Sequence, residues 1–126
     1  MSERGQAMAQ LQSRSLAQPD ETRPVDKGVV EVVRLDAATM MRTTFQPGWR
    51  WSECVKPIVG GESCQVNHVG YCVSGRLHVR MDDGDEMDIG MGDASHIPPG
   101  HDAWVIGDEP YVAIDFSGAE EYAKRS

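Results

Sequence analysis

The stretch that decides the fold is GDASHIPPGHDAW, residues 92–104. Its Gly-Asp pair is typical of a turn that begins a strand. Pro98 and Pro99 fix φ and donate no backbone hydrogen bond, and Gly100 allows a backbone conformation that other residues avoid. His101 therefore follows directly on a rigid corner and begins the next strand. Taken alone, the stretch also fits a plain strand corner with a surface histidine.

Short apolar runs separated by turn residues occupy the chain on both sides of this corner. From residue 28 onward β-branched residues become frequent, and Gly, Pro and Asp-Gly clusters recur between the runs. Many short strands of this kind are typical of an antiparallel sandwich or barrel. The expected strands are 29–35, 39–45, 49–55, 64–73, 76–81, 86–89, 95–97, 103–106 and 111–116, with a loop at 56–62.

Composition and charge restrict the class of protein. The 126 residues suffice for one domain with a real core, and 40% of them are hydrophobic. The net charge of −8 and the isoelectric point near 4.8 argue against nucleic acid and anionic membranes as partners, because both attract a basic surface. With no membrane-spanning run and no signal peptide visible, we expect a cytoplasmic protein. Its three cysteines, an odd number, favour reduced thiols.

Three segments are expected along the chain. Residues 1–27 are polar and contain two prolines, which predicts a flexible arm or an arm that docks on a partner subunit. Residues 28–118 form the barrel. Residues 119–126 form a tail with a short helical turn, anchored by Tyr122. Because the polar arm could cross to a neighbouring chain, we expect a homodimer.

The order of elements from residue 48 to residue 116 resembles the cupin superfamily, whose members are jelly-roll barrels also described as double-stranded β-helices. Gly92, Pro98 and Gly100 match the spacing of the second cupin motif. Pro47-Gly48 and Gly75 match the frame of the first. The runs at 49–53 and 101–104 also look like those of a group of small bacterial cupin-domain proteins. The resemblance implies an all-β jelly-roll barrel that commonly pairs through its sheets.

The resemblance also implies a metal site inside the barrel, although the ligand positions are altered. Cys54 and Lys56 stand where the superfamily has a His-x-His pair, and His68 stands where it has a Glu. In the second motif the usual ligand position is Ala103, and the histidine lies two residues earlier, at His101. Because side chains alternate with a period of two along a strand, His101 keeps the facing of the expected ligand.

His68 and His101 are therefore the main candidate ligands. Cys54 would complete a set of two histidines and one cysteine, and Cys64, on the same strand face as His68, is a candidate fourth ligand. Thiolate favours zinc over magnesium or manganese, and iron, nickel and manganese stay open as alternatives. The other interpretation is a metal-free barrel in which these polar groups are hydrogen-bonded to one another.

Strand parity also predicts which residues line the interior. The expected pocket residues are Trp51, Val66, Cys72 and Trp104, with core packing as the alternative for the cysteine and the tryptophans. Lys56 could act as a base or bind an anion if it points inward, and Glu53 could act as an acid or base. Solvent exposure is the alternative for both. His78 and His96 are expected to face outward.

These residues predict a barrel that binds a small organic molecule beside a divalent metal. If the protein is an enzyme, the resemblance implies metal-dependent isomerase, lyase or dioxygenase chemistry. The alternatives are a non-catalytic ligand-sensing or regulatory module, and a metal-free barrel that serves as a structural dimer. The sequence shows neither a nucleophile elbow nor a phosphate-binding loop, which argues against covalent hydrolysis.

Overall fold

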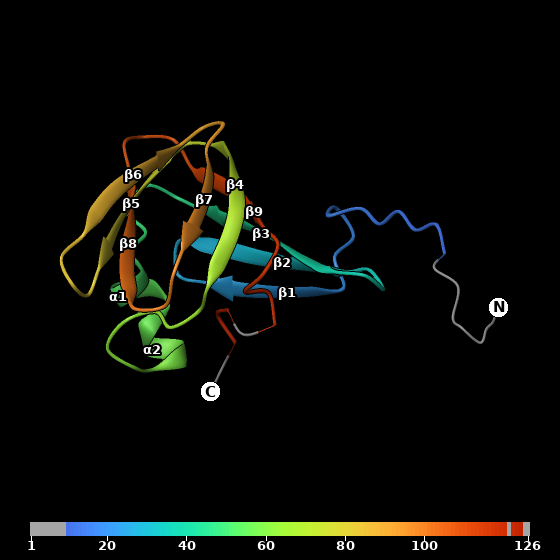
Figure 1. Ribbon diagram of the computed structural model, residues 1–126, viewed down its shortest axis with the longest axis horizontal. Helices are drawn as coiled ribbons and strands as arrows, with labels where there is room; N and C mark the ends of the chain where they lie inside the picture. Colours follow the sequence, from blue (N-terminus) through green and yellow to red (C-terminus); the bar gives the residue numbers. More distant parts are fainter. Residues whose placement is uncertain (1–9, 121, 125–126) are drawn as a thin grey trace.

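Antiparallel strands are the main regular structure of the computed structural model, which describes residues 10–120 and 122–124 (Figure 1). The first three strands are β1 (Glu21–Val25), β2 (Gly28–Arg34) and β3 (Thr39–Phe45). Two single-turn helices follow, α1 (Trp51–Cys54) and α2 (Lys56–Val59). The remaining strands are β4 (His68–Ser74), β5 (Arg76–Met81), β6 (Glu86–Gly90), β7 (Ala94–Ile97), β8 (His101–Ile106) and β9 (Tyr111–Asp115).

The strands form two sheets with the core between them. The larger sheet has the order β1-β2-β3-β9-β4-β7, and the smaller has the order β6-β5-β8. The buried core cluster joins side chains of the larger sheet, such as Val30 and Met41, to Leu77 and Val105 of the smaller one. The two short helices lie at one end of the barrel, beneath β8 in the view of Figure 1. Within the described residues, no helix has the length and apolar character needed to span a bilayer.

Alternation of side chains along the strands decides which residues reach the interior. In β8, His101, Ala103 and Val105 are buried, and the residues between them are only half-buried. In β3, Met41 and Phe45 face the core in the same way. Because successive side chains of a strand point to opposite faces, a shift of one residue would expose all of these groups. The prediction of an all-β barrel with His101 facing inward is therefore confirmed.

The corner before β8 adopts the geometry that its sequence predicts. Gly100 has a φ of +95°, in the region that favours glycine. Its N–H donates to the carbonyl oxygen of Cys64 at 2.7 Å. The N–H of Cys64 in turn donates to the carbonyl oxygen of His101 at 2.8 Å. An isolated bridge thus fixes Cys64 beside the first residue of β8.

The predicted strand at 49–55 is wrong, because residues 51–54 form helix α1. The N–H of Cys54 donates to the carbonyl oxygen of Arg50, and that of Val55 donates to Trp51. From residue 51 to residue 55 the buried side chains are Trp51, Cys54 and Val55, which is a helical spacing. Trp49 is buried as well, so residues 49 and 51 by themselves suggest the alternation of a strand. The predicted loop at 56–62 likewise begins with α2. The predicted strand at 64–73 starts only at His68, since Cys64 pairs with β8 instead.

The boundary of the expected N-terminal arm is also wrong. Residues 21–25 form the edge strand β1, paired antiparallel with β2 along its whole length. Residues 1–9 of the expected arm lie outside the described residues. The expected C-terminal tail packs on the core through Ala119 and Tyr122, both buried. The N–H of Tyr122 donates to the carbonyl oxygen of Gly118, which closes one hydrogen-bonded turn.

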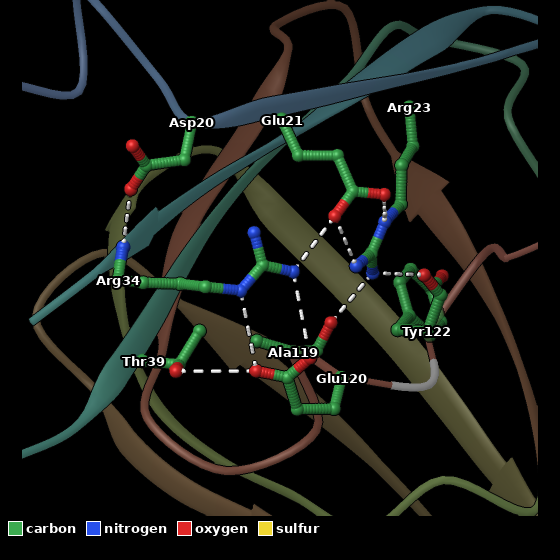
Figure 2. A network of polar contacts seen from close by, with 8 residues as sticks. All are labelled: Asp20, Glu21, Arg23, Arg34, Thr39, Ala119, Glu120 and Tyr122. Atoms are coloured by element: carbon green, nitrogen blue, oxygen red, sulfur yellow. Dashed lines mark hydrogen bonds and ion pairs between the residues drawn. The ribbon is translucent and has the colours of Figure 1, made fainter.

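A charged network explains why β1 and the C-terminal segment are held in place (Figure 2). Glu21 accepts hydrogen bonds from Nε of Arg23 at 2.7 Å and from Nη2 of Arg34 at 2.8 Å. The buried guanidinium of Arg23 also donates to the carbonyl oxygens of Ala119 at 2.5 Å and Tyr122 at 2.8 Å. A buried charge is stable only with hydrogen-bond partners, so Arg23 needs these carbonyl oxygens. Its hydrogen bonds to them hold the C-terminal segment against β1.

We expect Glu21→Gln to lower the free energy of unfolding at neutral pH by about 1 kcal/mol or less, as for a partly exposed ion pair. Hydrogen bonds from Arg23 first, and then from Arg34, lower the pKa of Glu21 from its ordinary value of 4.5 to about 2. The stabilisation is therefore complete above pH 4.5 and is lost as the pH falls through the lowered pKa. Urea unfolding of both proteins at several pH values measures the difference. A difference that does not shrink in acid would contradict the assignment.

Candidate metal centre

Three side chains from separate segments converge inside the barrel. One potential ligand atom from each of Cys64, His68 and His101 lies within 4.8 Å of the others. The Sγ atom of Cys64 is 3.8 Å from Nε2 of His68, and the centroids of the two imidazole rings are 5.4 Å apart. His68 begins β4 and His101 begins β8, while the bridge to β8 brings in Cys64. Two imidazole nitrogens and one sulfur are a donor set that suits zinc and other transition metals.

Hydrogen bonds at Nδ1 orient both imidazole rings. Nδ1 of His101 lies 2.8 Å from the carbonyl oxygen of Pro98, which can only accept, so this nitrogen carries the proton. Nδ1 of His68 is hydrogen-bonded to Oδ2 of Asp115. With the proton held at Nδ1, Nε2 in each ring keeps the lone pair that can bind a cation; in His68 this atom faces the Cys64 thiol, whose proton a bound cation would displace. Metal-binding histidines typically have such an outer partner, so the residues present fit a metal.

Asp115 is the residue of the candidate site that the sequence predictions missed. It ends β9, and its side chain is buried. Its Oδ1 atom accepts hydrogen bonds from the N–H groups of Ser117 and Gly118, at 2.8 and 3.2 Å. Its position in the strand could have revealed it, because Asp115 is four residues after Tyr111 and therefore lies on the same, inner face of β9. A carboxylate at an interior position needs a partner, and His68 is that partner.

Burial controls the protonation of the other two groups. Removal from water raises the pKa of the Cys64 thiol to about 11. The same effect lowers the pKa of His101 to about 4, against the opposing hydrogen bond to Pro98. At neutral pH the metal-free site therefore contains a neutral thiol and a neutral imidazole. A bound cation would favour the thiolate, which is the ligand form of cysteine.

Cys54, expected as the third ligand, lies outside this group. Helix α1 places its Sγ atom 3.9 Å from Oδ2 of Asp26. Its place beside the histidines is taken by Cys64, which the sequence proposed only as a fourth ligand. The reason is the local backbone, since a helix at residues 51–54 turns Cys54 through a different angle than a strand would.

A cavity of about 60 Å³ adjoins the two histidines and has largely aromatic walls. The aromatic residues that line it include Phe45, Trp49, Trp51, Tyr111 and Tyr122. The ring of Tyr122 stands edge-on to that of His68, with centroids 4.9 Å apart. Trp51 and Tyr122 also border a second cavity, of about 280 Å³, which is lined by Cys64 and Val66.

Of the four expected pocket residues, Trp51 lines the barrel cavity and Val66 lines only the second one. Cys72 is a core residue that borders neither, with its Sγ atom 3.4 Å from the carbonyl oxygen of Ser74. Trp104 lies on the outer face of β8, because side chains alternate along the strand and those of Ala103 and Val105 face inward. There the guanidinium carbon of Arg50 lies 4.1 Å from the centroid of its ring.

The two catalytic candidates from the sequence lie outside the barrel cavity. Glu53 is exposed on α1, and Nζ of Lys56 is 3.8 Å from a carboxylate oxygen of Glu62. His96 is exposed, with Nε2 2.7 Å from Oδ1 of Asn67. His78 is half-buried on the outer face of β5, so neither histidine joins the site.

Solved structures of other proteins share this architecture. An RmlC-like cupin from Shewanella frigidimarina NCIMB 400 matches with a TM-score of 0.59 and 22% identity, over 90% of this chain and 97% of that one. Oxalate decarboxylase from Lactobacillus farciminis, solved as a formate complex, matches with a TM-score of 0.57 and 19% identity, over 81% of this chain and 32% of its own. KdgF from Halomonas sp. has a TM-score of 0.52 and 19% identity, over 80% of this chain and 84% of its own.

No protein-family model matches the sequence, and no curated protein matches it. Structural likeness at this level of identity establishes a common fold and leaves activity to be argued from the site. The two facing antiparallel sheets and the glycine corner before β8 agree with the resemblance found in the sequence. The chain therefore has the cupin fold, an all-β jelly-roll barrel.

Proposed function

We propose that this protein binds a divalent transition metal, with zinc favoured, through Cys64, His68 and His101. The observation that carries the proposal is the convergence of three ligand atoms from separate segments within 4.8 Å. Their chemistry supports it, because two nitrogens and one sulfur leave one tetrahedral position for a further ligand. Open positions of this kind are typical of catalytic rather than structural zinc sites.

We propose further that a small organic molecule binds beside the metal in the barrel cavity. A bound zinc would supply Lewis acidity to such a molecule. The cavity walls are largely aromatic, and Asp115 holds the proton at Nδ1 of His68. Burial raises the pKa of Tyr111 and Tyr122, so both phenols keep their protons at neutral pH and can donate hydrogen bonds. A metal-dependent isomerase, lyase or dioxygenase is the enzyme class that this arrangement would suit.

A non-catalytic ligand-sensing module is the second candidate. Among the described residues that line the barrel cavity, Asp115 is the one carboxylate, and it is committed to His68 and two backbone N–H groups. Neither Glu53 nor Lys56 lines the cavity. The cavity therefore offers few groups that could act as a free general base, which favours binding without turnover. The homodimer and the cytoplasmic location expected from the sequence stay predictions, which sedimentation and cell fractionation would test.

Metal analysis tests the proposed site directly. We expect untagged protein to hold about one equivalent of transition metal after reconstitution, because a true site fills at its own affinity. Each of the variants Cys64→Ala, His68→Ala and His101→Ala should lose most of it. Cys54→Ala is the matched control, since Cys54 is also a buried thiol but lies outside the cluster.

Two outcomes would contradict the metal proposal. Wild-type protein that takes up less than about one-tenth of an equivalent has no such site. Full metal content in all three ligand variants, with folding verified by circular dichroism, would show that the metal binds elsewhere.

We expect Asp115→Asn to weaken metal binding by about 10–100-fold, the usual effect of losing a histidine's outer partner. The new side-chain oxygen would still accept from Ser117 and Gly118, which turns the amide N–H₂ toward His68. Nδ1 of His68 would then have to accept, and the proton would move to Nε2, the atom that binds the metal. Competition with a chromophoric chelator measures the affinity, with Asp108→Asn on an exposed turn as the control. Equal affinity in both variants would rule out this role for Asp115.

A further inference from the structure

The indole N–H of Trp49 lacks a partner at the wall of the barrel cavity. Among the residues that the structure describes, its Nε1 is the one fully buried side-chain nitrogen or oxygen without a hydrogen bond. Trp49 is only 2% exposed, and it lines the cavity together with both histidines. Leaving a buried donor unpaired costs free energy, so each such group in a folded protein calls for an explanation.

The ring of Trp49 has little freedom to find a partner elsewhere. It stacks on Phe45, with centroids 3.8 Å apart and planes inclined by 2°. Its backbone is held on both sides, because its N–H donates to Gln46 and its carbonyl oxygen accepts from Val105. The indole ring is therefore held in place. Because its Nε1 is fully buried, an acceptor reaches it only from a ligand that enters the cavity and displaces the side chains around that atom.

The charges around the cavity indicate what kind of acceptor fits. No lysine or arginine lines the cavity in the described part of the chain. With a divalent metal bound, the Cys64 thiolate and the Asp115 carboxylate would balance its two positive charges. An anionic ligand would add an unbalanced negative charge among aromatic walls, which is costly, whereas an uncharged ligand would not.

We propose that the barrel cavity selects small uncharged carbonyl compounds, such as a short amide, aldehyde or ketone, whose oxygen accepts a hydrogen bond from the Trp49 indole. The volume of about 60 Å³ restricts the ligand to a few non-hydrogen atoms. Carboxylates of the same shape are rejected. The inference deepens the proposed function and rests on it for the ligand's place beside the metal, but the indole hydrogen bond itself needs no metal.

Acetamide and acetate are matched probes, since they share their shape and number of non-hydrogen atoms and differ in charge. The readout is the indole N–H signal of Trp49 in nuclear magnetic resonance spectra of ¹⁵N-labelled protein, assigned by its loss in Trp49→Phe. We expect a saturable shift with acetamide in both metal-free and zinc-loaded protein. Binding of acetate should be at least about tenfold weaker, a ratio that one buried charge readily produces.

The variant Trp49→Phe keeps the aromatic surface and removes the donor. We expect it to weaken acetamide binding about tenfold, followed through the tyrosine and histidine signals of the cavity, because one buried hydrogen bond is lost. Trp104→Phe is the matched control, as Trp104 lies on the outer face of β8 away from the cavity. If Trp49→Phe does not fold, Trp51→Phe and Trp104→Phe assign the other two indole signals, and the shift of the remaining wild-type signal decides.

The outcomes separate this inference from the metal proposal. Acetate binding as tightly as acetamide overturns the preference for uncharged ligands. An indole signal that neither probe shifts, in protein that binds zinc normally, overturns the inference and leaves the metal site standing. An acetamide-dependent indole shift in protein that does not bind zinc supports the Trp49 site and overturns the proposed metal function.

Discussion

The backbone hydrogen bonds between Cys64 and the start of β8 hold the candidate site together. The N–H of Gly100 donates to the carbonyl oxygen of Cys64, whose own N–H donates to His101, and Gly100 adopts a positive φ at this corner. The bridge places the thiol beside His101, and the chain then needs only four residues to reach His68 at the start of β4. This junction joins the segment before β4 to the smaller sheet, and it brings Cys64, His68 and His101 together.

From this junction a series of hydrogen bonds runs outward through the barrel wall. Backbone N–H groups after β9 bind Asp115, and Asp115 binds His68. On the other side the carbonyl oxygen of Pro98 fixes His101. Each imidazole is hydrogen-bonded at Nδ1, on the side of the barrel wall, and leaves Nε2 for the cavity. Because both imidazoles are hydrogen-bonded at Nδ1, their rings are held in the orientation that the proposed metal site requires.

The rest of the barrel supplies rigidity and exclusion of water. Aromatic rings fill the end of the interior near the histidines, and the C-terminal segment closes it with Tyr122. That segment is held by Arg23, which reaches the carbonyl oxygens of Ala119 and Tyr122 from β1. The edge strand and the segment around Tyr122 therefore contribute to the cavity, where the sequence predicted a flexible or partner-docked arm and a tail anchored by Tyr122.

The sequence alone was enough for the antiparallel strands, the rigid corner and the inward facing of His68 and His101, and the resemblance implied the jelly-roll barrel. The strands, the corner and the facing follow from local rules, because glycine and proline restrict the backbone and side chains alternate along a strand. The identity of the third ligand, the role of Asp115 and the place of Trp49 depended on contacts between distant segments. A short run such as residues 51–54 has no local preference strong enough to choose helix over strand, so packing decided it. That choice removed Cys54 from the site and left Cys64 to meet the histidines.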